Sequence, residues 1–154
     1  MEAVQPKILK KETFKIVGLK YYGKNENNET QDLWKNFLNR CCEIKNKIDD
    51  SNYYGICKLS CESNKISYIA SVKVSTSTDI PEEMVCKILP STKYAIFTHK
   101  GSLKSLGHTY EYIYGTWLPN SSYEHSNLPD IEVFSKICSE DDIDNVIYIH
   151  IPIK

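Results

Sequence analysis

The chain has 154 residues, about the size of one ordinary domain with a single core, so more than two domains are not expected. Its 19 basic and 20 acidic residues nearly balance, and the lack of a polybasic patch argues against a nucleic-acid-binding surface. No apolar run approaches the roughly 18 residues of a membrane span, and residues 1–14 lack a signal-peptide pattern, so we expect a cytoplasmic protein.

The first half of the chain is typical of a strand, a helix and then two strands. Residues 14–22 have the composition of a strand, and residues 30–47 place apolar side chains at helical spacing. Residues 53–59 and 66–74 predict a β-hairpin. A polar stretch at residues 75–83 then links the two halves.

The second half repeats this order of elements. We expect a strand at residues 93–99, a helix over residues 103–118, and a hairpin formed by residues 131–137 and 146–151. Pro119 would remove a backbone donor from a continuing helix, so the helix is expected to end just before it.

The two halves also align with each other when the chain is shifted by 80 residues. KILKKETFKIV at residues 7–17 lies over KILPSTKYAIF at residues 87–97, and the register continues without a gap. Chance alignment of apolar residues is the alternative, but the ordered matches favour an internal repeat of residues 1–79 and 80–154 within one domain, residues 1–154.

The repeat predicts an α+β fold with a particular symmetry. Each half would be one copy of a strand-helix-strand-strand module, with antiparallel sheets and two helices overall. The two modules would face one another about a pseudo-two-fold axis. A groove between the modules follows from that arrangement.

Six cysteines raise the question of zinc or disulfides, but no CxxC pair or finger-like cysteine and histidine spacing is present. Cys57 and Cys61 flank the turn of the first predicted hairpin and lack two further ligands. We expect reduced thiols, no metal and no cofactor. The six cysteines are Cys41, Cys42, Cys57, Cys61, Cys86 and Cys138.

A carboxylate interrupts an apolar strand at Glu132, in the sequence IEVF. Side chains alternate along a strand, so Glu132 and Phe134 share one face while Ile131 and Val133 share the other. Because residues 146–151 supply apolar side chains, we expect the helix-packed face to be built without Glu132, whose own face is then free to line the groove. A solvated strand face is the alternative, whereas burial requires a partner or a shifted pKa.

Aromatic residues gather around Glu132 in the expected repeat. The shift of 80 residues pairs Tyr54 with Phe134 and Tyr68 with Tyr148. One carboxylate between aromatic walls suits a flat cation, because each ring face attracts a cation by roughly 0.5 to 2 kcal/mol. Core filling is the alternative for any single aromatic residue, but for the set we favour a pocket.

Motifs along most of the chain point to a known family. The segments YAIFTHKGSL, YEYIYGTWLPNSSY, LPDIEVF and VIYIHIPIK resemble the second half of the GyrI-like small-molecule-binding family. That family includes the effector-binding domains of multidrug-responsive regulators such as Rob and BmrR. LWKNF, YYGIC and VKV resemble the first half, and the element from Trp-Leu-Pro to the glutamate is the most specific part.

The resemblance implies a duplicated module with a ligand pocket between the two copies. In such a pocket, Glu132 would meet cationic or lipophilic aromatic compounds, and Trp117 matches the family's tryptophan before Leu-Pro. Ile131 and Phe134 depart from the residues common at these positions, which affects the shape of the wall. The predicted ligand-binding residues are Glu132, Trp117, Tyr68, Tyr54, Phe134 and Tyr148.

Three functions remain open from the sequence. The first is a stand-alone module that senses or sequesters hydrophobic or cationic small molecules, without direct nucleic-acid or membrane binding. The second is a hydrolase of cyclopropane-bearing cytotoxic compounds, in which Glu132 would be catalytic and activate water. The third is a protein-interaction module like the family members that inhibit DNA gyrase. Binding and hydrolysis would use the same carboxylate, so the sequence leaves open whether the protein is an enzyme.

Overall fold

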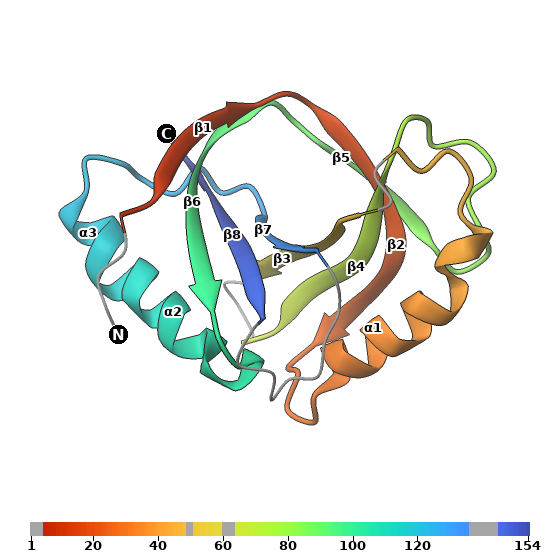
Figure 1. Ribbon diagram of the computed structural model, residues 1–154, viewed down its shortest axis with the longest axis horizontal. Coiled ribbons are helices and arrows are strands. Elements are labelled where there is room, and N and C mark those ends of the chain that lie inside the picture. The colour runs from red at the N-terminus through yellow and green to blue at the C-terminus, as the bar shows by residue number, and fades with distance from the viewer. Residues whose placement is uncertain (1–4, 49–50, 60–63, 136–144) are drawn as a thin grey trace.

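The computed structural model describes residues 5–48, 51–59, 64–135 and 145–154. Within them, eight strands form one antiparallel sheet in the order β1-β6-β8-β7-β3-β4-β2-β5. Helices α1 (Glu29–Arg40) and α2 (Leu106–Tyr112) cover the two halves of the sheet (Figure 1). The strands are β1 (Lys7–Lys11), β2 (Phe14–Gly23), β3 (Tyr53–Leu59), β4 (Ile66–Val74), β5 (Val85–Leu89), β6 (Thr92–Lys100), β7 (Asp130–Phe134) and β8 (Val146–Ile153).

The two halves of the chain meet at the centre of the sheet, where β3 pairs with β7. The order strand, helix, strand, strand recurs as β2-α1-β3-β4 and β6-α2-β7-β8, which confirms the predicted α+β fold class. The first hairpin has the predicted bounds. The second hairpin begins at Asp130, and the end predicted for its first strand, together with the linking segment, lies outside the described residues.

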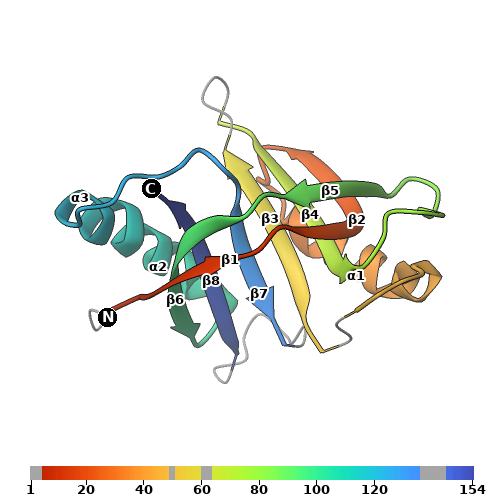
Figure 2. The same cartoon turned by 90° about the horizontal axis from the view of Figure 1, so that it is seen from above.

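Strands β1 and β5 are absent from the sequence-based prediction. β1 pairs with β6 and β5 pairs with β2, so each half contributes an edge strand to the other half. The K-I-L triplets at residues 7–9 and 87–89 lie in these two strands. Figures 1 and 2 show the connections from β1 to β2 and from β5 to β6 arching over the central strands. Because β1 is almost wholly exposed, its residues carry little of the alternation that reveals a strand.

The second helical segment continues past Pro119, contrary to expectation. A 3₁₀ turn precedes α2, a π-helical turn at Ile113–Trp117 follows it, and a last short turn, α3, spans Leu118–Asn120. A proline ring crowds the carbonyl four residues earlier and donates no backbone hydrogen bond, and a wider π turn at this point removes that conflict. The helical segment ends at Asn120.

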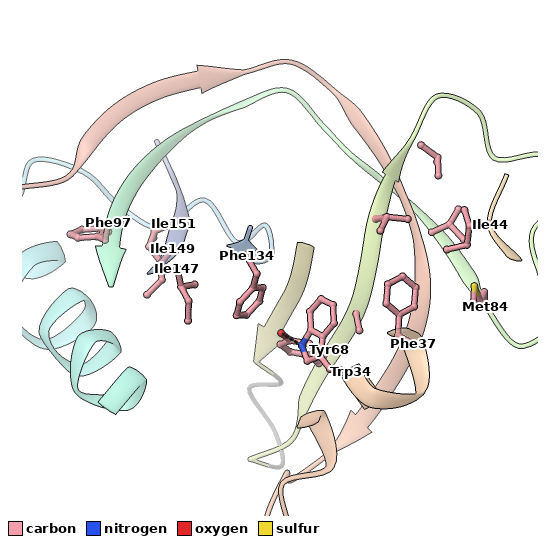
Figure 3. Close-up of a cluster of buried hydrophobic side chains, with 14 of the residues drawn as sticks. Trp34, Phe37, Ile44, Tyr68, Met84, Phe97, Phe134, Ile147, Ile149 and Ile151 are labelled. Carbon is pink, nitrogen blue, oxygen red and sulfur yellow. Dashed lines mark hydrogen bonds between the residues drawn. The ribbon is translucent and has the colours of Figure 1, made fainter. Parts of the chain in front are cut away.

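Both faces of the sheet carry buried side chains. The helix-covered core includes Phe37, Val72, Ile113, Ile147 and Ile149, several of which Figure 3 shows. The core on the far face includes Ile16, Tyr54, Ile56, Leu89, Tyr94 and Ile131.

Glu132 lies on the helix-covered face. It is the cross-strand partner of Ile149 on β8, and directly paired side chains share a face of the sheet. The expectation that the helix-packed face is built without Glu132 is therefore wrong. The helix-covered face and the groove face are the same face.

The uniform shift of 80 residues also fails at the level of side-chain direction. Tyr54 lies in the far-face core while Phe134 lies in the helix-covered core, and Tyr68 is buried while Tyr148 is 44% exposed. An even shift preserves the face in a strand, because the side-chain period is two. The equivalent positions in the two hairpins are thus offset by an odd number of residues, and a one-residue offset inverts every side chain.

His150 on β8 gives a prediction about stability and pH. It is 6% exposed, its ring contacts that of Tyr94 at 5.7 Å, and burial, followed by the charge of Lys11, lowers its pKa from 6.5 to about 4. As the pH falls from 6.5 towards 4, His150 is protonated in the unfolded state but stays neutral in the folded state, so the folded protein loses stability. Between pH 7.5 and 4.5 we expect His150 to lower the free energy of unfolding by about 2 to 3 kcal/mol.

The variant His150→Phe tests this, because it keeps a ring without a titratable nitrogen. Chemical unfolding at several pH values should show that, as the pH falls, the free energy of unfolding decreases less in the variant than in the wild type. Parallel stability curves for the two proteins would show that His150 is not the titrating group.

Candidate functional site

Glu132 occupies the middle of the helix-covered face and is 7% exposed. Its Oε1 accepts a hydrogen bond from the Tyr68 hydroxyl at 2.9 Å, and its Oε2 accepts one from the Tyr110 hydroxyl at 2.7 Å. Tyr68 comes from β4 and Tyr110 from α2, so the carboxylate joins the two halves of the molecule. Both partners are neutral donors.

Trp34 on α1 extends this network. Its Nε1–H donates to the Tyr68 oxygen at 3.0 Å (Figure 3). This leaves the Tyr68 proton directed at Glu132. The Trp34 ring also makes an edge contact with Phe134, at 5.4 Å between centroids. One continuous chain of hydrogen bonds therefore runs from α1 through β4 to the carboxylate on β7.

Burial raises the pKa of Glu132, while the hydrogen bonds from Tyr110 and Tyr68 oppose that rise and nearby Asp130 adds to it. Burial and the Glu132 charge also raise the pKa of both tyrosines well above 10, so both hydroxyls remain protonated donors. Within the described residues, no basic side chain forms an ion pair with Glu132. Among the described residues, the carboxylate is therefore held by two hydroxyl donors and not by an ion pair.

A cavity of about 710 Å³ lies against this carboxylate. That volume falls in the range of about 300 to 1,000 Å³ that is usual for small-molecule sites. Its apolar wall consists of Trp34, Leu38, Ile66, Tyr68, Leu103, Leu106, Phe134, Val146 and Ile147. Polar side chains, which include Asn25, Gln31, Lys35, Lys104 and Asn145, complete the lining.

Three of the predicted ligand-binding residues meet in this cavity: Glu132, Tyr68 and Phe134. The other three do not line it. Trp117 lies near the end of the second helical segment. Its ring packs against those of Phe97 and Tyr123, at 5.0 Å and 6.2 Å between ring centroids.

Tyr54 and Tyr148 are corrections to the predicted aromatic wall. Both pair with Val133, whose side chain points away from the helices, so both lie on the opposite face of the sheet from Glu132. The physical reason is the odd offset between the two hairpins. It directs the side chains of these two tyrosines to the face of the sheet that the helices do not cover.

Sequence reasoning missed Trp34 and Tyr110. Both sit on helices, which the alternation argument treated only as cover for the sheet. The signal was present in α1, where Trp34 and Phe37 follow helical spacing on the buried stripe. In the second helical segment, Tyr110 and Tyr114 are four residues apart and so lie on one side of the helix.

A second carboxylate on β7 is held in a similar way. The Tyr114 hydroxyl donates to Asp130, and the Tyr114 ring stacks on that of Tyr110. His125 Nδ1 accepts the backbone N–H of Asn127, so its Nε2 carries the proton that it donates to Asp130 at 2.9 Å. Asp130 therefore has its own partners and fastens the helix to β7.

The described cysteines form no metal centre. Cys41, Cys42, Cys57 and Cys86 are free thiols, and Cys61 and Cys138 lie outside the described residues. The described ranges contain no group of three potential metal ligands. Burial and the charge of Glu132 raise the pKa of Cys57, which keeps this cavity thiol protonated and poorly nucleophilic.

Among the described residues, no helix is both long enough and apolar enough to cross a membrane.

The antiparallel sheet, its two covering helices and the cavity between them define a small-molecule effector-binding module. The match to a family model identifies the group. Residues 7–153 match the family described as Cass2, integron-associated effector binding protein, and the chain belongs to this family. The predicted GyrI-like resemblance is thereby confirmed.

One relative by sequence is a transcription regulator. The chain is 31% identical over 130 residues to the transcriptional regulator BrlR of Pseudomonas aeruginosa, a match that covers 84% of this chain and 48% of BrlR. The chain thus spans about half the length of this curated relative.

Two solved structures share the fold. SAV2435 bound to tetraphenylphosphonium has a TM-score of 0.72 and 21% identity, and the match covers 98% of this chain and 94% of that one. The C-terminal domain of EcmrR has a TM-score of 0.76 and 11% identity, with 97% of both chains covered.

Proposed function

We propose that the chain binds lipophilic aromatic cations in the cavity, with Glu132 as the counter-charge, and that it thereby senses or sequesters them. The observation that carries this proposal is a buried carboxylate that accepts hydrogen bonds from two tyrosine hydroxyls and forms no ion pair among the described residues, set in a cavity with an apolar and aromatic wall. A lipophilic cation supplies an opposite charge without requiring a hydrogen-bond donor. The tetraphenylphosphonium in SAV2435 is a ligand of this chemistry and supports the proposal.

The expected affinity is reachable with the groups present. Micromolar binding requires about 8 kcal/mol. Ring faces such as those of Trp34 and Phe134 attract a cation by roughly 0.5 to 2 kcal/mol each. Burial of the ligand's apolar surface adds about 25 cal/mol for each Å² removed from water, and the carboxylate adds a charge interaction that is strengthened by its partial desolvation.

The hydrogen bonds at Glu132 favour binding over hydrolysis. Burial raises the pKa of Glu132, but both carboxylate oxygens accept a hydrogen bond from a tyrosine hydroxyl, and these donors stabilise the charged form and oppose that rise. A general base benefits from a pKa near the working pH, whereas a counter-charge only needs to be ionised. Because Glu132 is buried, a partner protein could not contact it directly, which also disfavours a protein-interaction role for this residue.

The similarity to BrlR supports a sensing role. The matched part is about half of that transcriptional regulator. For this chain, the proposed signal is the occupancy of the cavity by a ligand. The sequence-based prediction that the isolated chain does not bind nucleic acid accompanies this proposal.

The pH dependence of binding tests the proposed function. The pKa of Glu132 is raised above 4.5, and the cation prefers the ionised form, so the affinity for tetraphenylphosphonium should be highest above that pKa. Below it, affinity should fall by up to about tenfold per pH unit. Calorimetric titrations from pH 8 downwards, within the range where the protein stays folded, measure this.

Neutral triphenylphosphine oxide is the matched control, because it keeps three phenyl rings without a net charge. Its affinity should change little with pH. Equal pH dependence for the two compounds would remove Glu132 from the binding account.

A further inference from the structure

Tyr68 reaches Glu132 across an intervening strand. In the sheet, β4 and β7 lie on either side of β3, and adjacent strands are about 4.8 Å apart. The Tyr68 side chain therefore has to lie flat over β3 to bring its hydroxyl within 2.9 Å of Glu132. The residue of β3 beneath this crossing is Gly55, which pairs directly with Glu132.

Gly55 leaves no room for a side chain. A Cβ atom at this position would lie 2.1 Å from the Tyr68 hydroxyl oxygen, 2.8 Å from Tyr68 Cζ and 3.3 Å from Glu132 Oε1. Real Cβ atoms essentially never approach another heavy atom within 3.0 Å, so Tyr68 would have to move.

The need for glycine here is spatial and not conformational. Gly55 lies in the middle of a regular strand paired on both sides, and among the described glycines only Gly101 has a positive φ. An ordinary residue can adopt the backbone of Gly55. What an ordinary residue cannot do is coexist with the tyrosine that lies over it.

We propose that Gly55 is a positioning residue that sets the specificity of the cavity for cations. The absence of a side chain at this position lets Tyr68 deliver one of the two hydrogen bonds that keep Glu132 ionised. This inference rests on the proposed function, because it concerns the same site. It adds that the charge of the pocket depends on Gly55, a residue that has no side chain.

Replacement of Gly55 by alanine should act through Tyr68. A displaced Tyr68 leaves Glu132 with Tyr110 as its hydroxyl donor, and the loss of a donor to the charged form raises the carboxylate's pKa. Of the other titratable groups near Glu132, Asp130 raises the carboxylate's pKa in the same direction, whereas the Cys57 thiol stays protonated and contributes no charge. The pocket would therefore be less anionic at neutral pH.

Binding as a function of pH is the first readout. Gly55→Ala should weaken tetraphenylphosphonium binding at pH 7 on the order of tenfold and move the pH at which affinity falls upwards. Tyr68→Phe should do the same, and the double variant should shift no further than either single variant. Additive shifts, or an unshifted profile for Gly55→Ala, would overturn the proposal.

Thermal stability is the second readout and needs no ligand. Gly55→Ala should lower the melting temperature by several degrees in the wild-type background. In a Tyr68→Leu background, which removes the ring, the same substitution should cost little. An equal loss in both backgrounds would also overturn the proposal.

The control is Gly107→Ala, because a Cβ at Gly107 meets nothing within 4 Å. It should change neither the affinity for tetraphenylphosphonium nor the pH dependence of that affinity. If the wild type binds no tetraphenylphosphonium at any pH, the proposed function fails and the specificity role fails with it. The rescue by Tyr68→Leu still decides whether Gly55 positions Tyr68.

Discussion

The variant Glu132→Gln should lose about 1.5 to 3 kcal/mol of binding free energy for tetraphenylphosphonium, roughly a 10- to 150-fold weaker affinity. The amide has nearly the shape of the carboxylate, and its oxygen and nitrogen can both bond to the hydroxyls of Tyr68 and Tyr110. The fold should therefore survive. Only the charge that the cavity offers to a cation is removed.

The stability of the unliganded protein distinguishes charge from structure in this variant. A buried carboxylate without a cationic partner is unfavourable, so its replacement should not lower the free energy of unfolding at pH 7. Neutral triphenylphosphine oxide should bind the wild type and Glu132→Gln with similar affinity. A variant that is much less stable, or that loses both ligands equally, would point to a structural role.

The same variant separates binding from hydrolysis. If Glu132 activates water, Glu132→Gln should keep most of its affinity for a cyclopropane-bearing substrate and lose turnover. Incubation of the wild type with such compounds, followed by mass spectrometry of the products, provides the reference. Product formation by the wild type that disappears in the variant would replace the binding account with an enzymatic one.

Trp34→Ala should have the largest effect on stability, a loss of about 3 to 5 kcal/mol in the free energy of unfolding. The Trp34 ring is buried among Phe37, Tyr53 and Phe134, and its N–H holds the Tyr68 hydroxyl. Its removal opens a void in the core and releases Tyr68 from one of its two hydrogen bonds. Denaturant unfolding of the wild type and the variant measures the loss.

The two tryptophans of the chain provide a matched comparison for binding. Trp34→Phe keeps an aromatic ring but lacks the N–H donor, and it should weaken tetraphenylphosphonium binding because Trp34 lies in the cavity wall. Trp117→Phe should leave the affinity unchanged, since Trp117 packs against Phe97 and Tyr123 outside the cavity. The reverse ranking would favour the sequence-based placement of Trp117 in the pocket.

Much of the fold follows from local patterns in the sequence. The first hairpin was predictable because two runs rich in apolar and β-branched residues flank a short polar stretch at residues 60–65, and its bounds agree with β3 and β4. The shared face of Glu132 and Phe134 follows from the alternation of side-chain directions along a strand. The edge strand β1 was not predictable, because its stability comes from pairing with β6 and not from a pattern of its own.

Two of the predicted pocket residues lie on the opposite face of the sheet because their placement depended on long-range register. Tyr54 and Tyr148 were placed by an even shift between the two halves, while the hairpins are related by an odd one. A sequence comparison tolerates such an offset, since apolar residues occur on both faces of this sheet. Only the pairing of strands fixes which face each residue occupies.

Helical spacing places Trp34 and Tyr110 on buried helix faces, but it does not show what these two residues or Gly55 contribute to the site. Each one acts through a partner on another element, so its role appears only after the helices and strands are assembled. The organisation as one domain, the origin of the two halves by duplication and the cytoplasmic location stay predictions of the sequence.

Two ions of nearly the same shape test most directly whether the cavity selects positive charge. Tetraphenylphosphonium and tetraphenylborate both carry four phenyl rings around a central atom, but their charges are opposite. Calorimetry at pH 7 should give measurable binding for the phosphonium and an affinity at least about 100-fold weaker for the borate, and Glu132→Gln should narrow that gap. Equal affinities for the two ions in the wild type, or tighter binding of the borate, would contradict the account.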